Sequence, residues 1–238
     1  MHHAYGRTTG YRHGRCCLET NDEGLAFVAG REDDHQVTRL LAGLARAKGR
    51  ALPMTPSLLQ RISRKENPQI VLGAFEQRWL GFDHINARNH ETWVALDRVR
   101  DPGNLGTIMR SADAVGASGL ILIGDCTDPY SVEAVRASMG AVFNTQIIAC
   151  SESAFLKFAA SWKGRIVGTA LSASIDYRKA DYGRPLIMMM GNEQSGLTGN
   201  LMKACSQLIK LPMLGRSDSL NLAVATGIVL YETMERVD

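Results

Sequence analysis

The segment PLIMMMGNEQSGL, residues 185–197, places a run of apolar residues directly before a turn in which a glutamate stands between two glycines. A strand that is apolar at every position is buried on both faces, which is typical of a parallel sheet covered by helices on both sides. In such sheets ligands bind beyond the carboxyl ends of the strands. The segment therefore predicts the architecture and the end of the sheet at which chemistry is expected.

Short apolar segments of the same kind recur through the second part of the chain. The expected strands are residues 92–97, 119–124, 145–150, 165–171 and 208–213. The expected helices between and after them are residues 103–117, 131–142, 153–164, 196–207 and 221–235. Strands that alternate with helices in this way predict an α/β domain built on a parallel sheet. We assign this domain to residues 92–238.

A smaller α/β unit is predicted at residues 21–82. It has a strand from residue 25, a helix capped by Asp33 or Asp34 and ended by Gly49, a second helix at 56–66 and a strand at 69–75. A unit of about 60 residues rarely has a sufficient core alone, so we expect it to be stabilised by the rest of the chain. Residues 1–20 are expected to form an irregular arm, and residues 83–91 a linker.

The composition indicates a cytoplasmic protein without a metal centre. The net charge is +3, but residues 1–90 hold 13 Lys and Arg against 9 Asp and Glu, whereas residues 91–238 hold 14 against 15. The basic first part is compatible with a polyanion-binding face or with a solvated surface. The 5 cysteines form no CxxC pair and the 6 histidines show no metal-ligand spacing. The sequence contains no signal peptide and no apolar run of about 18 residues, so we expect no contact with a membrane.

Two segments that follow strands carry polar residues in unusual positions. In residues 96–117, Asn104 stands where a helix N-cap is expected and Arg110 follows within the helix. Both have an ordinary explanation, since Asn104 could only cap the helix and Arg110 could pair with Asp113 on a solvated face. In the turn of residues 191–196, Glu193 could be a cap or could orient a cation or an arginine. The turn lacks the GxxxxGK[ST] spacing of a phosphate-binding loop, and a carboxylate would repel phosphate.

The third segment, residues 208–232, joins a strand to the last helix. Its loop contains Ser219 and Asn221, and Ser219 alone would be read as the N-cap of the helix. The helix begins with Ala223, Ala225 and Gly227, small residues that allow close backbone contact.

Together the three segments form an ordered set: DPxNxGxIxRxA, then GNExxGL, then LPMxGxxxSLN. This set resembles the SpoU (TrmH-like) family of RNA ribose 2′-O-methyltransferases, part of the SPOUT superfamily, over residues 93–235. The N-terminal unit more loosely resembles an L30e/L7Ae-like substrate-binding domain, through NPQIVLGAF at residues 67–75. The strand and helix that usually lie upstream in that domain are replaced here by the irregular first 20 residues, which implies a truncated version.

The resemblance implies a fold and a co-substrate. The C-terminal α/β domain is expected to be a SPOUT-type parallel sheet with a trefoil knot whose loops hold S-adenosyl-L-methionine, mainly through backbone groups. By match of motif this pocket should involve Thr169, Gly191, Leu211, Met213 and Leu220. A Rossmann-type pocket is disfavoured, because the first strand–helix turn, DPGNLG, has only GxxG. No metal is implied.

The resemblance also implies the catalytic residues Asn104, Arg110, Glu193, Ser219 and Asn221. A guanidinium hardly deprotonates in proteins, so we interpret Arg110 as a clamp on the phosphate next to the reacting 2′-hydroxyl. The base is then the phosphate, a water molecule or a transiently neutral arginine. Glu193 would orient Arg110 or Asn104, and the remaining polar side chains would hydrogen-bond the ribose and each other.

The expected partners are RNA and a second copy of the chain. The C-terminal helix is apolar on more than one face, which favours a homodimer in which the arginine of one chain reaches the pocket of the other; the alternative is a monomer that buries the helix in its own core. Ribosomal RNA is favoured over transfer RNA because of the L30e-like unit. Two alternatives remain: a base methyltransferase that uses Asp218, and an RNA-binding protein without catalysis.

Overall fold

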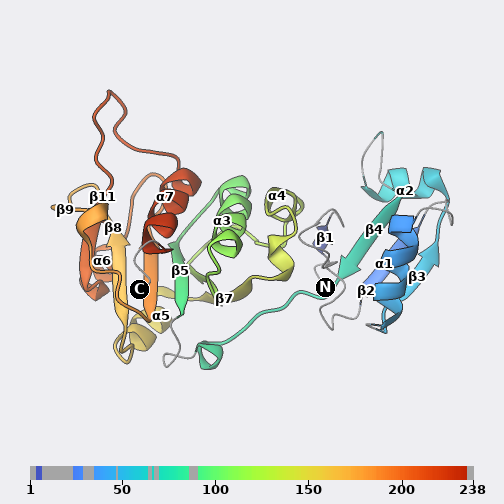
Figure 1. The fold of residues 1–238 in the computed structure, drawn as a ribbon, viewed down its shortest axis with the longest axis horizontal. Coiled ribbons are helices and arrows are strands. Elements are labelled where there is room, and N and C mark those ends of the chain that lie inside the picture. Colours follow the sequence, from blue (N-terminus) through green and yellow to red (C-terminus); the bar gives the residue numbers. More distant parts are fainter. Residues whose placement is uncertain are drawn as a thin grey trace.

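The computed structural model describes residues 4–6, 24–28, 35–46, 48–63, 66, 70–85 and 91–234. These residues form a small sheet near the N-terminus and a large sheet that occupies the rest of the chain (Figure 1). The first of the two sheets is mixed, and every strand pair in the second is parallel.

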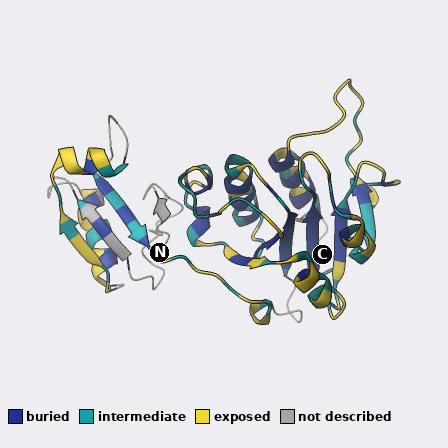
Figure 2. Ribbon diagram, turned by 180° about the vertical axis from the view of Figure 1, so that it is seen from behind, coloured by how far each residue is buried: buried dark blue, intermediate teal, exposed yellow. Residues whose placement is uncertain are grey.

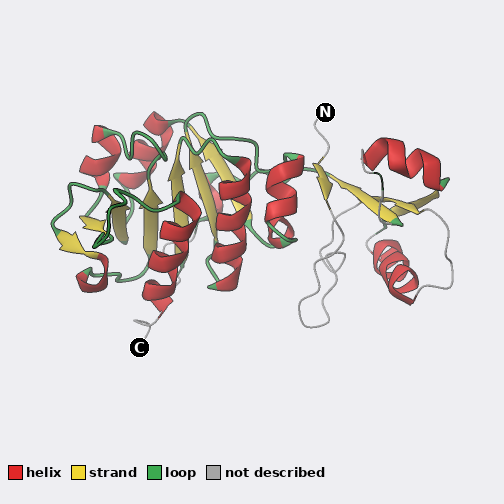
Figure 3. Ribbon diagram, turned by 90° about the horizontal axis from the view of Figure 1, so that it is seen from above, coloured by secondary structure: helices red, strands yellow, loops and turns green. Residues whose placement is uncertain are grey.

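The large sheet confirms the prediction of a parallel α/β domain. Its strands are β5 (Thr92–Asp97), β6 (Gly119–Ile123), β7 (Gln146–Cys150), β8 (Arg165–Thr169), β9 (Ile175–Asp176), β10 (Leu186–Met190) and β11 (Gln207–Lys210), in the order β7-β6-β5-β10-β8-β11-β9. Helices α3 (Pro102–Ala114), α4 (Val132–Ala137) and α7 (Leu222–Met234) cover one face, and α5 (Glu152–Ala159) and α6 (Gly199–Ala204) cover the other (Figure 3).

The two faces of β5 show why a continuous apolar strand suits this position. Val94 and Leu96 pack in the hydrophobic core under α3 and α7, whereas Trp93 and Ala95 pack in the core on the α5 and α6 side. All four side chains are fully buried, and the central strands appear as a dark band in Figure 2. Because side chains alternate between the faces of a strand, burial on both faces requires apolar residues throughout.

The strand order brings distant segments together at the carboxyl ends of the central strands. β10 lies between β5 and β8, and Met190, its last residue, is in register with Leu96. The turn that follows β10 therefore lies directly beside the residues that follow β5. This adjacency positions the candidate site.

The described residues of the N-terminal unit form a four-stranded sheet with two helices. Its elements are β1 (Ala4–Gly6), β2 (Gly24–Val28), α1 (His35–Arg46), β3 (Arg50–Pro53), α2 (Pro56–Ser63) and β4 (Val71–Phe75), with strand order β1-β4-β2-β3. The expectation of an arm without regular structure is wrong for residues 4–6, which pair antiparallel with β4. Backbone pairing to an exposed sheet edge requires no hydrophobic periodicity, so the sequence pattern gave no sign of β1. Residues 7–20 of the predicted arm, with Cys16 and Cys17, lie outside the described residues.

The segment between the two sheets is only partly irregular. Residues 76–81 run along the edge of the large sheet, where the amide of Leu80 donates to the carbonyl of Ile147 at 2.9 Å. A short 3₁₀ helix, Phe82–His84, follows, and the ring of Phe82 stacks on Phe158 with centroids 4.3 Å apart. Residues 86–90 of the predicted linker, and the predicted caps Asp33 and Asp34, lie outside the described residues.

Three predicted helix caps are wrong. Asp101 caps α3, and its side chain accepts from the amide of Asn104. The helix begins at the proline of position 102, directly after this cap, so Asn104 lies inside the helix. Thr198 caps α6, so Glu193 is not the cap of that helix. Asn221 rather than Ser219 caps α7, since its Oδ1 accepts from the amides of Ala223 and Val224 at 2.9 and 3.2 Å. In each helix a residue other than the predicted one has the geometry of the cap. For α3 this leaves the side chain of Asn104 available for a different contact.

The three described cysteines are thiols in partly buried positions. Burial raises the pKa of the Cys150 thiol to about 11 and that of Cys205 to about 12. These thiols therefore stay protonated near neutral pH and are poor nucleophiles. In the described parts of the chain no helix is long and apolar enough to cross a membrane.

Candidate functional site

The turn after β10 needs both of its glycines. A Cβ on Gly191 would lie 2.4 Å from the backbone carbon of Gly196, and Gly196 has a φ of +64°. The amide of Gly196 donates to the carbonyl of Asn192 at 2.9 Å, and the amide of Asn192 donates back to Gly196 at 3.2 Å. The turn is therefore closed on itself, and Glu193 stands at its exposed tip.

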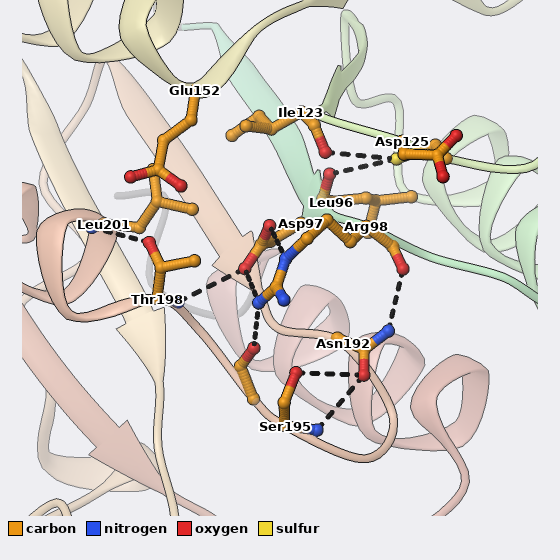
Figure 4. Close-up of polar contacts among 12 residues, drawn as sticks. Leu96, Asp97, Arg98, Ile123, Asp125, Glu152, Asn192, Ser195, Thr198 and Leu201 are labelled. Carbon is orange, nitrogen blue, oxygen red and sulfur yellow. Dashed lines mark hydrogen bonds and ion pairs between the residues drawn. The ribbon is translucent and has the colours of Figure 1, made fainter.

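A partly buried ion pair holds this turn against the end of β5 (Figure 4). Asp97 has a side chain only 1% exposed, and Arg98 donates to both of its carboxylate oxygens, each at 2.8 Å. The Arg98 guanidinium also donates to the carbonyl of Gly196 at 3.2 Å. The amide side chain of Asn192 donates in return to the carbonyl of Arg98 at 2.8 Å. We call Asp97, Arg98 and Asn192 the strand-end clamp.

The backbone of Arg98 shows that the strand-end clamp is a costly arrangement. Its φ is +50°, a left-handed conformation that costs a non-glycine residue about 1–2 kcal/mol. The neighbouring carboxylate raises the pKa of Arg98 above its ordinary value, mainly through the hydrogen bond. The sequence interpretation missed these residues. The signal that could have revealed them is the charged pair at the end of a strand whose central residues are all apolar.

Glu193, Asn104 and Asn221 form a second network, which the sequence placed together only by resemblance. The amide group of Asn104 donates to Oε1 of Glu193 at 3.2 Å, across 89 residues of chain. The side-chain oxygen of Asn104 accepts from the amide group of Asn221 at 2.9 Å, across 117 residues. Both ends of the Asn104 amide are thus fixed, which sets its orientation. The network links the turn after β10 to α3 and to the start of α7.

A cavity of about 250 Å³ adjoins this network. All five residues predicted for the co-substrate pocket line it: Thr169, Gly191, Leu211, Met213 and Leu220. The predicted catalytic residues Glu193 and Ser219 line it as well, together with Asp218. The cavity lies at the carboxyl ends of β8 and β10, where ligands of parallel sheets bind.

The lining suits S-adenosylmethionine. Most of the wall consists of apolar side chains and of backbone, which matches an adenine held by main-chain groups and a sulfonium in a weakly polar surrounding. Gly191, on this wall, can lie close to the backbone of Gly196 and Leu197 because it has no Cβ. The wall also carries charged side chains of both signs, Glu193, Asp218 and Lys210.

Arg110 stands apart from the other predicted site residues. It is exposed on α3, does not line the cavity, and makes no hydrogen bond or ion pair within the described parts of the chain. The alternative pairing with Asp113 is therefore not formed. The guanidinium remains available to a group outside this chain.

The comparison with known proteins agrees with these observations. The model of the SpoU rRNA Methylase family matches residues 91–231. The 23S rRNA (uridine(2479)-2'-O)-methyltransferase of Streptomyces viridochromogenes is 33% identical over 192 residues, which span 78% of this chain and 67% of that protein.

Two of the similar solved structures differ in how much of the chain they cover. The crystal structure of an AdoMet-bound rRNA methyltransferase from Sinorhizobium meliloti matches with a TM-score of 0.84 and 42% identity, covering 93% of this chain and 82% of that one. The A. aeolicus TrmH/SpoU tRNA modifying enzyme matches with a TM-score of 0.54 and 27% identity, covering 63% of this chain and 77% of that one. The first of these likenesses therefore extends beyond the large sheet, whereas the second covers a shorter part of the chain.

Proposed function

This chain belongs to the SpoU rRNA Methylase family, and from that premise we propose that it moves a methyl group from S-adenosylmethionine to a ribose 2′-hydroxyl of ribosomal RNA. It is an S-adenosylmethionine-dependent RNA 2′-O-methyltransferase. The observation that carries the proposal is the cavity at the ends of β8 and β10, on which the five predicted donor-binding residues converge beside Glu193.

Ribosomal RNA is favoured by the extent of the likeness. The structure from Sinorhizobium meliloti, named an rRNA methyltransferase, matches nearly the whole chain, whereas the tRNA modifying enzyme from A. aeolicus matches 63% of it. The N-terminal unit, with its β1-β4-β2-β3 sheet, is then the part that distinguishes the two substrate classes. We propose that this unit, residues 21–82, is an L30e-like RNA-binding domain that precedes the methyltransferase domain of residues 92–238.

The reaction joins the ribose oxygen to the methyl carbon while the bond from that carbon to sulfur breaks. The sulfonium supplies a methyl group with a good leaving group, so the protein must align the two reactants and assist loss of the hydroxyl proton. In our proposal Arg110 binds the phosphate next to the acceptor ribose and stabilises the charge that develops on the 2′-oxygen. The proton passes to that phosphate or to water.

The network of Glu193, Asn104 and Asn221 would fix the acceptor ribose. Glu193 holds the amide of Asn104 in one orientation, so the same amide presents a defined face to a ribose hydroxyl. Ser219, on the cavity wall, would add a further hydrogen bond. The strand-end clamp keeps Glu193 in place, because it fixes the turn that carries it.

Replacing Glu193 by glutamine tests this role. Glu193→Gln should lower kcat for methyl transfer by more than about tenfold, because the neutral oxygen of glutamine is a weaker acceptor than a carboxylate and holds the Asn104 amide less firmly. The dissociation constant for S-adenosylmethionine, measured by calorimetry, should stay within about threefold of wild type, since the pocket is held mainly by backbone. Unchanged turnover would show that Glu193 does not orient the site.

A homodimer completes the proposal. α7 exposes Val224, Ile228, Tyr231 and Met234, with 37–54% of each residue accessible, at spacings that place them along one side of the helix. A monomer that buried α7 in its own core would not leave this stripe on the surface. In a two-fold dimer formed through this helix, Arg110 of one chain would serve the cavity of its partner.

The trefoil knot also belongs to the proposal. β11 lies beyond β8 in the sheet, whereas α7, which follows it in sequence, packs against α3 on the other side of β10. The segment between β11 and α7 therefore returns across the sheet. Such a return is compatible with passage of this segment through the loop between β8 and β10. The loops of such a knot would carry the donor-binding residues.

The decisive experiment is transfer of label from S-adenosylmethionine to unmodified ribosomal and transfer RNA. A ribose 2′-O-methyl group blocks alkaline cleavage of the adjacent phosphodiester, so label in alkali-resistant dinucleotides of ribosomal RNA is the expected result. Alkali-resistant labelled dinucleotides from transfer RNA alone would assign transfer RNA as the substrate instead. Label in single nucleotides would indicate base methylation and direct attention to Asp218, and absence of label with S-adenosylmethionine bound would favour the binding-protein alternative.

A further inference from the structure

A second cavity lies at the opposite end of the large sheet from the candidate site. Its volume is about 570 Å³, and one wall is the segment of residues 75–80 that leaves the N-terminal unit. The other wall is formed by α4, the 3₁₀ helix Ala141–Phe143 and the start of β7. Because β7 begins at Gln146, this cavity adjoins the amino end of a strand, whereas the donor cavity adjoins carboxyl ends. We call it the junction pocket.

Aromatic rings dominate the junction pocket. Trp79 is 46% exposed, and its ring meets Tyr130 edge to face with centroids 5.2 Å apart. Phe75 and Phe143 form a similar pair at 4.9 Å. A half-exposed indole in a hollow offers a flat apolar surface on which another planar group can stack.

The aromatic wall is fixed rather than loosely placed. The hydroxyl of Tyr130 donates to the carbonyl of Arg78 at 2.5 Å and accepts from its amide at 3.2 Å. The indole nitrogen of Trp79 donates to Oε1 of Gln77 at 3.1 Å, and the amide of Leu80 is bonded to β7. A pocket whose wall is held in advance loses little entropy when a ligand binds.

The polar groups of the junction pocket are mainly neutral amides. Gln77, Asn144 and Gln146 line it, and the last two are exposed. Each side-chain amide both donates and accepts, as the edges of nucleobases do. Among the described residues of the lining, the charged side chains are one of each sign, Glu76 and Arg78, so these residues give no excess positive charge to attract a phosphate. A flat, uncharged heteroaromatic ring with donors and acceptors fits this lining best.

We propose that the junction pocket holds an unpaired base of the RNA substrate, stacked on Trp79 and hydrogen-bonded by the amides. This inference rests on the proposed function, since it assumes that RNA reaches the protein as substrate. An RNA that contacts both the N-terminal unit and the large sheet has to cross the segment of residues 75–80, where the pocket lies. The base would anchor the RNA at a distance from the reacting ribose, and the pocket would contribute to affinity rather than to the chemical step.

Photochemical cross-linking tests the contact directly. An unmodified ribosomal RNA transcript that contains 4-thiouridine would be irradiated with the full-length protein and digested with trypsin, which releases Trp79 in the peptide of residues 79–88. Nucleotide adducts on this peptide, suppressed by excess unlabelled transcript, are expected. Adducts confined to other peptides would overturn the proposal.

Kinetics separate base stacking from a structural role. Trp79→Ala should raise KM for RNA by about 10- to 100-fold, since the loss of base stacking on an aromatic side chain weakens binding by about this much, and should leave kcat within about twofold. Trp79→Phe keeps a ring and should stay within about fivefold of the wild-type KM. Met139→Ala removes another exposed apolar side chain, 51% accessible and outside both cavities, and should change neither constant.

Other outcomes would count against the pocket. An unchanged KM in Trp79→Ala, or a loss in kcat as large as the gain in KM, would overturn the proposal. An effect seen only with RNA that carries ribosomal proteins would assign the pocket to a protein partner. If the wild-type chain methylates neither RNA class, the proposed function fails first, whereas cross-links at residues 79–88 would still identify an RNA contact.

Discussion

Arg110→Ala is expected to lower kcat for methyl transfer by at least about 100-fold, the usual loss when a group that stabilises developing charge is removed. The exposed guanidinium has no partner within the described parts of the chain, so its removal should leave the melting temperature unchanged. Arg110→Lys keeps the charge but loses the two-pronged contact with phosphate, and should recover only part of the activity. Initial rates at saturating S-adenosylmethionine would measure the effect.

Arg136→Ala provides the matched control. Arg136 is also exposed, lies on the neighbouring α4, and has no part in the proposed site, so its replacement should leave kcat within about twofold of wild type. Equal losses in the two variants would mean that general surface charge, rather than a clamp at position 110, supports the reaction. An Arg110→Ala enzyme with full activity would contradict the proposed role.

A mixed dimer tests whether the arginine acts across chains. Chains with Arg110→Ala co-expressed with chains carrying Glu193→Gln should form dimers in which one site has both residues intact. Random pairing in a two-fold dimer then restores about a quarter of the wild-type sites, well above either variant alone. If Arg110 acted within its own chain, each mixed dimer would contain one lesion in each site and no activity would return.

Breaking the strand-end clamp should have the largest effect on stability. Arg98→Ala would leave the carboxylate of Asp97, 1% exposed, without its cation, and removing one partner of a buried pair typically costs about 3–5 kcal/mol. Since the Arg98 side chain is 32% exposed, the lower end of this range is expected. A loss of about 3 kcal/mol is a large share of the stability of an ordinary domain. Urea unfolding would measure it.

Arg98→Gly separates the backbone from the ion pair. Glycine adopts a φ of +50° without strain, so this variant should be about 1 kcal/mol more stable than Arg98→Ala, although both lose the ion pair. Both should also lose activity, because the turn that carries Glu193 is no longer held at Gly196. Equal stability of the two variants would show that the left-handed conformation is not retained, and wild-type activity in either would exclude a positioning role.

Much of the large sheet could be predicted because its signal is local. Five-residue apolar runs such as β6 and β10 are buried on both faces, and this burial is written into consecutive residues. The caps of α3, α6 and α7 were misjudged because several polar residues near each helix start could serve. In the structure, the side-chain oxygens of Asp101, Thr198 and Asn221 accept hydrogen bonds from backbone amides in the first turn of each helix. β1 could not be predicted, because it depends on the free edge of β4 rather than on its own side chains.

The sequence by itself determined the alternation of strands and helices, the glycines of the turn after β10, and the three motifs that the resemblance grouped into one site. Only the tertiary structure decided that Asn104 contacts Glu193 and Asn221, that Arg98 clamps the turn, and that Trp79 stands half-exposed in a second cavity. The physical reason is the range of the interactions. Hydrophobic periodicity and turn propensity act over a few residues, whereas contacts across 89 and 117 residues depend on β10 lying beside β5, an order that no local pattern encodes.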